Sequence, residues 1–106
     1  MPFVDLETVE SRELIPGTEV RFVHSDAMTL AYWTFEPDTD LPLHSHPHDQ
    51  VTNVIEGTLE LTLEGETRAL TPGTVAVIPS GMAHSARSVT HCRVIDVFHP
   101  VREDYR

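Results

Sequence analysis

Three histidines and a glutamine lie at spacings that suit a metal site. His44 and His46 are separated by one residue, Gln50 follows four residues later, and His84 lies on a later segment. If His44 and His46 lie on one strand, their imidazoles point to the same face, because strand side chains alternate with a period of two. A third imidazole and an amide oxygen from neighbouring strands then complete a pocket for a divalent transition metal. Such a pocket supplies Lewis acidity and indicates an enzyme.

A second group of candidate residues lies near the end of the chain. Asp96 and Phe98 share one face of a predicted strand, and Asp96 is flanked by apolar residues. Because burying a lone carboxylate is costly, we expect Asp96 to serve in proton transfer or in hydrogen bonding to a hydroxyl. The alternative is an ion pair with an arginine or a turn cap. Arg102 follows the bend at Pro100 and could fold back over the site to bind a carboxylate, although it could also be an exposed charge.

Short strands are the elements that must position these residues. Segments rich in β-branched and aromatic residues recur along the chain, separated by Gly, Pro, Asp and Glu. Residues 59–63 alternate strictly between apolar and polar, and 64–66 are typical of a hairpin connection. Turns are predicted at 71–73 and 79–81, where Pro and Gly favour the required backbone angles. The predicted strands are 20–24, 28–35, 50–55, 59–63, 67–70, 75–78, 84–89 and 93–98, a pattern typical of a β-sandwich or closed barrel.

The composition limits the classes of protein to which the chain can belong. Its 106 residues suffice for one domain with one core, and 40% of them are hydrophobic. The formal net charge of −10, reached without any lysine, repels nucleic acid and anionic membrane surfaces. An anionic small substrate therefore needs a local positive site, such as an arginine or a metal. No apolar run reaches the roughly 20 residues of a membrane helix.

The start of the chain and its cysteine content predict a cellular compartment. Residues 1–5 lack the basic region and the apolar stretch of a secretory signal. The single cysteine, Cys92, cannot form an internal disulfide, which fits a reducing environment. We therefore expect a cytoplasmic protein in which Cys92 is a small core residue. Its neighbours His91 and Arg93 leave a reactive thiol as the alternative.

Two stretches of the chain resemble the two motifs of the cupin superfamily. The first motif spans 44–57 and the second 73–88, and their histidines, glycines and proline have the expected spacings. This resemblance implies an all-β, single-domain jelly-roll barrel over residues 1–106. It also implies that His44, His46, Gln50 and His84 are the metal ligands. Two positions depart from the usual pattern: Gln50 stands where most cupins have glutamate, and Ser88 stands where the second motif often has asparagine.

The neutral ligand set has a chemical consequence. Imidazole nitrogens and an amide oxygen bring no charge, so the protein leaves nearly the full double charge of the cation uncompensated. Such a cation is a stronger Lewis acid, and attracts an anion more strongly, than one bound by a carboxylate. Nickel, zinc, iron and manganese all accept these ligands. The alternative is a metal-free cupin in which the histidines are half-buried and hydrogen-bonded.

The C-terminal segment indicates one family within the cupin superfamily. Residues 96–104, which read DVFHPVRED, resemble the KdgF family when taken with the ligand set and the chain length. These small cupins convert 4,5-unsaturated monouronates, the end products of pectin or alginate lyases, into linear keto sugars. The resemblance implies that Asp96 and Arg102 are catalytic, and that Phe98, Arg102 and Gln50 contact the anionic sugar. The resemblance favours nickel over the other candidate metals, and it implies a ring opening with ketonisation that involves no redox change.

Two other functions are compatible with the same residues. A metal-dependent cupin dioxygenase would consume oxygen, whereas ring opening would not. A non-catalytic sugar-binding cupin would bind the sugar without forming a product. We expect a homodimer, because a partner commonly covers the open edges of jelly-roll sheets.

The remaining histidines have weaker indications of function. His48 has the same parity as His44 and His46, but Pro47 precedes it, so we expect it at the rim of the site. The other three, His24, His91 and His99, lack a partner spacing and are expected at the surface or the barrel ends.

Overall fold

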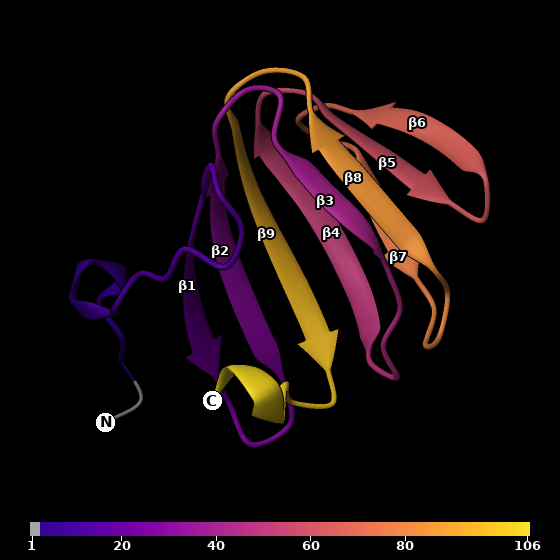
Figure 1. The fold of residues 1–106 in the computed structure, drawn as a ribbon. Helices are drawn as coiled ribbons and strands as arrows, with labels where there is room; N and C mark the ends of the chain where they lie inside the picture. Colours follow the sequence, from indigo (N-terminus) through magenta and orange to yellow (C-terminus); the bar gives the residue numbers. More distant parts are fainter. Residues whose placement is uncertain (1–2) are drawn as a thin grey trace.

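Nine strands form two antiparallel sheets in the part of the chain that the structure describes, residues 3–106 of a computed structural model (Figure 1). No helix within residues 3–106 is long and apolar enough to cross a membrane. The strands are β1 (Thr18–His24), β2 (Thr29–Phe35), β3 (Asp40–His44), β4 (Asp49–Glu56), β5 (Leu59–Leu63), β6 (Glu66–Leu70), β7 (Val75–Ile78), β8 (His84–Ser88) and β9 (Cys92–His99). Two short 3-10 helices, η1 (Leu6–Thr8) and η2 (Glu103–Tyr105), precede and follow them.

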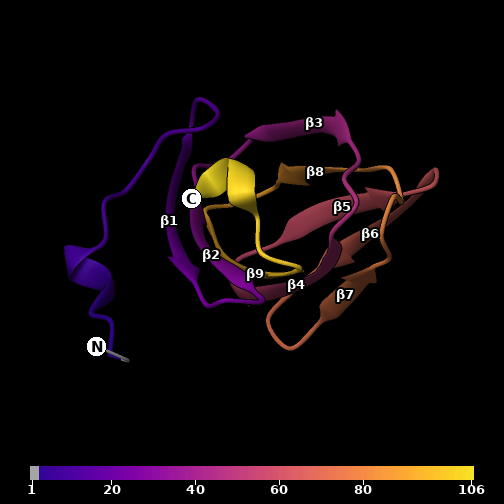
Figure 2. The ribbon, with the colours of Figure 1, turned by 90° about the horizontal axis from the view of Figure 1, so that it is seen from below.

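The two sheets face each other and enclose the core. One sheet has the order β1-β2-β9-β4-β7 and the other the order β3-β8-β5-β6. Seen along the barrel, the sheets curve around a common interior, and η2 lies at one end of it (Figure 2). The predicted all-β, single-domain barrel is therefore confirmed. Because β9 lies between β2 and β4, the last strand of the chain is central in its sheet.

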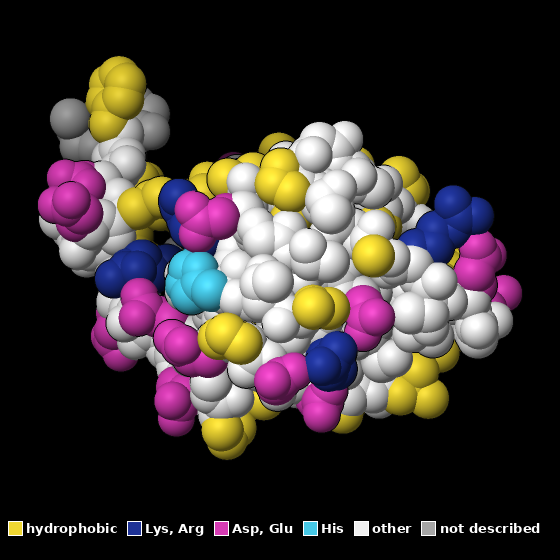
Figure 3. Space-filling model, turned by 90° about the horizontal axis from the view of Figure 1, so that it is seen from above, with side chains coloured by type: hydrophobic (Ala, Val, Ile, Leu, Met, Phe, Trp, Pro, Cys, Tyr) yellow, Lys and Arg dark blue, Asp and Glu magenta, His cyan; other side chains and the backbone are white. Residues whose placement is uncertain are grey.

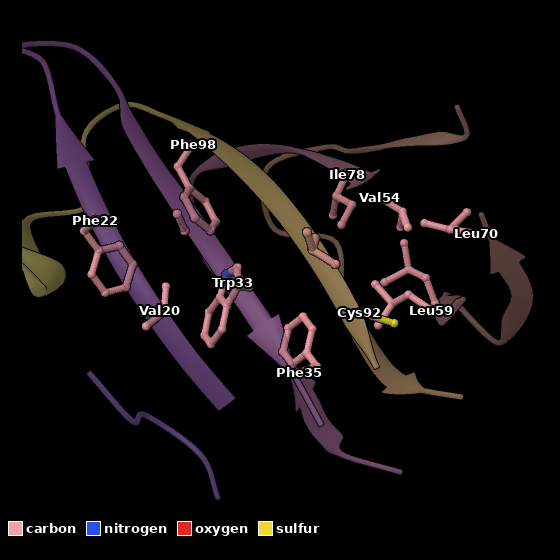
Figure 4. Packing of buried hydrophobic residues seen from close by; sticks show 13 residues of the cluster. Val20, Phe22, Trp33, Phe35, Val54, Leu59, Leu70, Ile78, Cys92 and Phe98 are labelled. Carbon is pink, nitrogen blue, oxygen red and sulfur yellow. The ribbon is translucent and has the colours of Figure 1, made fainter. Parts of the chain in front are cut away.

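Side-chain alternation explains which faces are buried. On β9 every second residue, from Cys92 to Phe98, is buried, and the residues between them are more exposed. Asp96 is the one polar member of this buried row, at 8% exposure. Aromatic rings form one side of the core, where the Trp33 and Phe35 ring centroids are 5.2 Å apart. Figure 4 shows these rings together with the aliphatic side chains at the other side of the core.

The predicted strands agree with the structure within one or two residues at their ends, and one strand was not predicted. That strand is β3 (Asp40–His44), which contains Pro42 and is mostly exposed. Its sequence, DLPLH, contains no β-branched residue and no Phe, Tyr or Trp, the residue types that mark most of the predicted strands. Glu64 and Gly65 have φ angles of 47° and 82°, which confirms the predicted tight connection between β5 and β6.

The end of the barrel away from η2 holds two residues singled out in the sequence. Figure 3 shows this end, where acidic side chains lie dispersed among arginine and apolar ones. Ser88 is buried here; its hydroxyl accepts a hydrogen bond from the Thr39 N–H at 3.0 Å and donates one to the Glu36 carbonyl at 2.6 Å. Ser88, which stands where the second cupin motif often has asparagine, therefore holds the connection between β2 and β3. Cys92 is fully buried, as expected for a core residue.

Candidate metal centre and acid group

A cavity of about 380 Å³ between the sheets brings together all the candidate site residues. They come from both sheets, from the loop between β3 and β4, and from the segment after β9. Most of the remaining lining is apolar, with Trp33 and Phe35 from β2 among it. The candidate residues that line it are His44, His46, Gln50, His84, Asp96, Phe98 and Arg102.

Three histidines converge in this cavity. His44 ends β3 and lies opposite His84, which begins β8 in the same sheet. His46 lies in the loop between β3 and β4, so the expectation that His44 and His46 share one strand is wrong. The bend after β3 nevertheless brings His46 back toward its neighbours. One ring nitrogen from each of the three histidines lies within 4.8 Å of the other two.

Backbone carbonyls determine the tautomer of each ring. All three Nδ1 atoms lie 2.7–3.1 Å from a carbonyl oxygen, which can only accept. Each Nδ1 therefore carries the proton, and each Nε2 has a free lone pair. This is the arrangement by which proteins orient histidines that bind metal. The accepting carbonyls are those of Pro42 for His44, His48 for His46 and Met82 for His84.

The ligand atoms fit a cation better than a proton. His46 Nε2 lies 3.0 Å from Gln50 Oε1, and both atoms are acceptors once the tautomer is assigned. Two acceptors at this separation repel each other unless a positive group lies between them. Burial lowers the pKa of His46, helped by Arg102, and burial also lowers the pKa of His84. His84 Nε2 is buried and has no hydrogen-bond partner among residues 3–106. These groups would hold a divalent transition metal.

A chain of hydrogen bonds links Gln50 to the acid group. The Gln50 amide donates to the Thr52 hydroxyl at 3.0 Å, and this hydroxyl donates to Asp96 Oδ1 at 2.7 Å. Thr52 and Asp96 are directly opposite each other on β4 and β9, with both side chains on the inner face. Gln50 lies two residues earlier on the same face of β4. The sheet register therefore places an acid next to the candidate metal ligands.

The environment of Asp96 suits proton transfer. Burial raises the pKa of Asp96 to about 6, and the hydrogen bond from Thr52 opposes part of that shift, helped by the nearby Gln50 amide. Trp33 Nε1 lies close enough to lower the pKa as well, although it has no hydrogen-bond partner within the described residues. A carboxyl group that titrates near neutrality can both accept and return a proton.

Arg102 brings a positive charge to the same cavity. Its side chain is 9% exposed, and its Nε and Nη2 donate to the two Asp104 oxygens at 3.0 and 2.8 Å. The guanidinium also lies 4.8 Å from the centroid of the Phe98 ring. The segment after β9 thus folds back over the cavity, as one of the two interpretations of Arg102 predicted. Nη1 takes no part in the pair with Asp104.

The other histidines lie outside the three-histidine cluster. His48 is half-buried, and its ring centroid is 5.5 Å from that of His46. His24 contacts Thr29 on the neighbouring strand, with 2.8 Å between Nδ1 and Oγ1. His91 and His99 are exposed. His24 at the end of β1 and the exposed His91 and His99 agree with the positions expected from the sequence.

Sequence reasoning missed three residues that contact the site. Thr52 could have been found from its parity, because it lies two residues after Gln50 on one strand. Asp104 and Tyr105 flank Arg102 through the turn of η2, and no spacing pattern in the sequence indicates that turn.

The chain is similar to known proteins along most of its length. Residues 31–98 match the family described as Cupin domain. The structure superposes on KdgF from Halomonas sp. with a TM-score of 0.92 and 30% identity, over 98% of this chain and 99% of that one. It superposes on an RmlC-like cupin from Shewanella frigidimarina with a TM-score of 0.93 and 26% identity, over 100% and 96% of the chains. The quercetin 2,3-dioxygenase of Bacillus subtilis is 46% identical over 52 residues, which are 47% of this chain and 15% of that enzyme.

Proposed function

This chain belongs to the cupin family and is a small cupin of the KdgF type, and from that premise we propose that it is an enzyme that linearises 4,5-unsaturated monouronates. The reaction opens the sugar ring and converts the resulting enol into a ketone. One observation carries the proposal. Asp96, buried and with a pKa raised to about 6, shares a cavity with three convergent histidines and Arg102. An acid–base group, a cation site and an anion-binding group are the parts that this reaction requires.

Arg102 and the cation site give the substrate its orientation. The uronate carboxylate would accept hydrogen bonds from the Arg102 guanidinium, whose Nη1 takes no part in the pair with Asp104. Phe98 lies under the guanidinium and would pack against the sugar ring. When a divalent metal is bound by His44, His46, Gln50 and His84, it supplies Lewis acidity to an oxygen on which negative charge develops. This local positive charge also offsets the repulsion of an anion by a chain of net charge −10.

Asp96 would move the proton. Its carboxylate accepts the proton of the hemiacetal hydroxyl, the carbonyl of the open-chain aldehyde forms, and the bond from that carbon to the ring oxygen breaks. The electron pair stays on the ring oxygen as an enolate. Asp96 then gives the proton to the carbon of the double bond that does not carry the enolate oxygen, which leaves a ketone. No electron enters or leaves, and such a positioned acid and base contributes roughly 10²–10⁴-fold to the rate.

The test is conversion of the substrate by the purified protein. An unsaturated monouronate made with a lyase absorbs in the ultraviolet through its conjugated double bond, and this absorbance is lost on ketonisation. We expect the protein to accelerate that loss and a chelator to abolish the acceleration. Asp96→Asn should lower kcat by about 10²–10⁴-fold while metal content stays at the wild-type level. Turnover of Asp96→Asn at the wild-type rate would falsify the role of Asp96.

A metal-dependent dioxygenase is the second candidate function. The local identity with quercetin 2,3-dioxygenase favours it, although the match spans a small part of that enzyme. The two candidates differ in oxygen demand. Oxygen uptake with a flavonol or another candidate substrate, together with no loss of uronate absorbance, would replace the first proposal by the second. Tight sugar binding without either reaction would instead support a non-catalytic sugar-binding cupin.

A further inference from the structure

Thr52 lies at the junction between the candidate metal site and the acid group. It is 3% exposed, and its hydroxyl contacts two side chains that are themselves buried, Gln50 at 3.0 Å and Asp96 at 2.7 Å. The side chain is held on a central pair of strands, β4 and β9, where it faces Asp96 across the ladder. Because threonine is branched at Cβ, its χ1 angle is restricted, and the strand therefore fixes the direction in which the hydroxyl points.

The single proton of the Thr52 hydroxyl determines the direction of every hydrogen bond between Asp96 and Gln50. A carboxylate can only accept, so the Thr52 O–H points to Asp96. The Thr52 oxygen must then accept from the Gln50 amide nitrogen. With its nitrogen committed to Thr52, Gln50 presents Oε1 toward His46. The ligand orientation of Gln50 therefore depends on a residue that is not itself a ligand.

The same series of hydrogen bonds explains why position 50 is glutamine. A glutamate there could supply an oxygen to a metal but could not donate a hydrogen bond to Thr52. Thr52 would then have one proton for two carboxylates, that glutamate and Asp96, and an oxygen of one of them would face the Thr52 oxygen without a hydrogen bond in a buried site, at considerable cost. The amide of Gln50 satisfies both demands, because it is an acceptor at one end and a donor at the other.

We propose that Thr52 is a positioning residue that holds the Gln50 amide in its ligand orientation and the Asp96 carboxylate in the cavity through one hydroxyl group. The effect on turnover rests on the proposed function, whereas the effect on metal affinity does not. Outer-shell partners of this kind typically contribute 10–100-fold to metal affinity or activity.

The experiment compares full-length Thr52→Val, Thr52→Ser and wild-type protein. Valine keeps the branched shape and removes the hydroxyl, whereas serine keeps the hydroxyl and removes the methyl group. Each protein is loaded with Ni²⁺, and its affinity is measured by competition with a chelator. Turnover of unsaturated monouronate is measured on the same samples. Thr62→Val is the matched control, since Thr62 is also a strand threonine whose hydroxyl is hydrogen-bonded, to Thr67 at 2.7 Å, but on a different strand and away from the cavity lining.

We expect Thr52→Val to lose about 10–100-fold in Ni²⁺ affinity and to lose turnover even when saturated with Ni²⁺. Thr52→Ser should recover both, and Thr62→Val should change neither. Wild-type affinity in Thr52→Val, or an equal loss in Thr52→Ser, would overturn the inference, because packing rather than the hydroxyl would then be responsible. Thr52→Ala, read by the same affinity measurement, replaces valine if circular dichroism shows that Thr52→Val does not fold.

The two proposals can fail separately. If wild-type protein converts no unsaturated uronate but Ni²⁺ affinity follows the hydroxyl, the proposed function is wrong and the positioning role of Thr52 toward Gln50 stands. If the wild type is active and both affinity and turnover ignore the hydroxyl, the role of Thr52 is wrong and the proposed function stands.

Discussion

The guanidinium carbon of Arg102 lies 4.3 Å from the centroid of the Tyr105 ring, so the last turn of the chain holds the proposed anion-binding group in place. Phe98 lies 4.8 Å away from the same guanidinium, and the Tyr105 ring stacks on Phe22 at 4.4 Å. Arg102 thus contacts aromatic rings from β9 and η2, and through Tyr105 it is tied to β1. A guanidinium held in this way has lost its rotamer freedom before the substrate arrives, which lowers the entropic cost of binding.

Replacing Tyr105 should therefore weaken substrate binding more than catalysis. Tyr105→Leu removes the aromatic face and with it about 1 kcal/mol of cation–π attraction, which corresponds to roughly a fivefold higher KM. The kcat value should change little, because Tyr105 takes no part in the hydrogen bonds that link Gln50, Thr52 and Asp96. Tyr105→Phe keeps both stacks and should match the wild type. Steady-state kinetics with unsaturated monouronate measures this difference, and an unchanged KM in Tyr105→Leu would contradict the role given to the stack.

Two histidines of one loop should differ in their effect on metal binding. His46 belongs to the cluster whose nitrogens lie within 4.8 Å of one another, whereas His48 does not. We expect His46→Ala to lose more than about 100-fold in Ni²⁺ affinity, since outer-shell changes alone cost 10–100-fold. His48→Ala should retain the affinity, because the His48 carbonyl that orients His46 belongs to the backbone. Metal content after competition with a chelator gives the answer, and equal losses in both variants would place His48 among the ligands.

The candidate site was predictable because its residues have spacings in the sequence that place them on one face of a strand or in one motif. The parity of Asp96 and Phe98 on one strand placed both on the inner face, and the structure has them there. The histidine spacings likewise predicted a cluster, although by a wrong route. His46 lies beyond the end of β3, so the loop after the strand, rather than strand alternation, brings it toward His44.

The contacts that the sequence did not predict depend on register and on turns. Thr52 meets Asp96 only because β4 and β9 pair in one particular register, across 44 residues of sequence. Nothing local to either strand specifies that pairing. Tyr105 reaches Arg102 through a short 3-10 turn, for which propensities are weak. The homodimer and the cytoplasmic location concern other molecules and the cell, and both stay predictions.

Gly57, the last residue of the first cupin motif, should be the glycine least tolerant of a side chain. Its φ is +86°, and a Cβ added there would lie 2.1 Å from the His91 carbonyl oxygen and 2.7 Å from Thr90 Oγ1. We expect Gly57→Ala to reduce the free energy of unfolding by about 3 kcal/mol or more. Gly65→Ala is the control, because φ is +82° but nothing lies within 4 Å of the added Cβ; backbone strain alone should cost about 1 kcal/mol. Urea unfolding of both variants tests the difference, which should vanish if only the φ angle matters.

The ionised form of Asp96 should lower the free energy of unfolding at and above neutral pH. Residues kept for activity often reduce stability in this way. The pKa of Asp96 rises from 3.8 to about 6 on folding, so the folded state binds the proton more tightly than the unfolded state. The resulting stabilisation is complete below pH 3.8 and is lost as the pH rises through about 6, a change of about 3 kcal/mol. Asn at this position carries no charge at any pH.

The free energy of unfolding of Asp96→Asn, relative to the wild type, should therefore increase by about 2 kcal/mol between about pH 4 and about pH 7. A chelator is kept in the buffer, because a bound cation would lower the pKa of Asp96 in the wild type. Asp26→Asn, at an exposed position, is the control and should follow the wild type at both pH values. A relative stability of Asp96→Asn that stays constant between the two pH values would mean that the carboxyl is solvated in the protein. It would then lack the environment that lets it return a proton near neutrality.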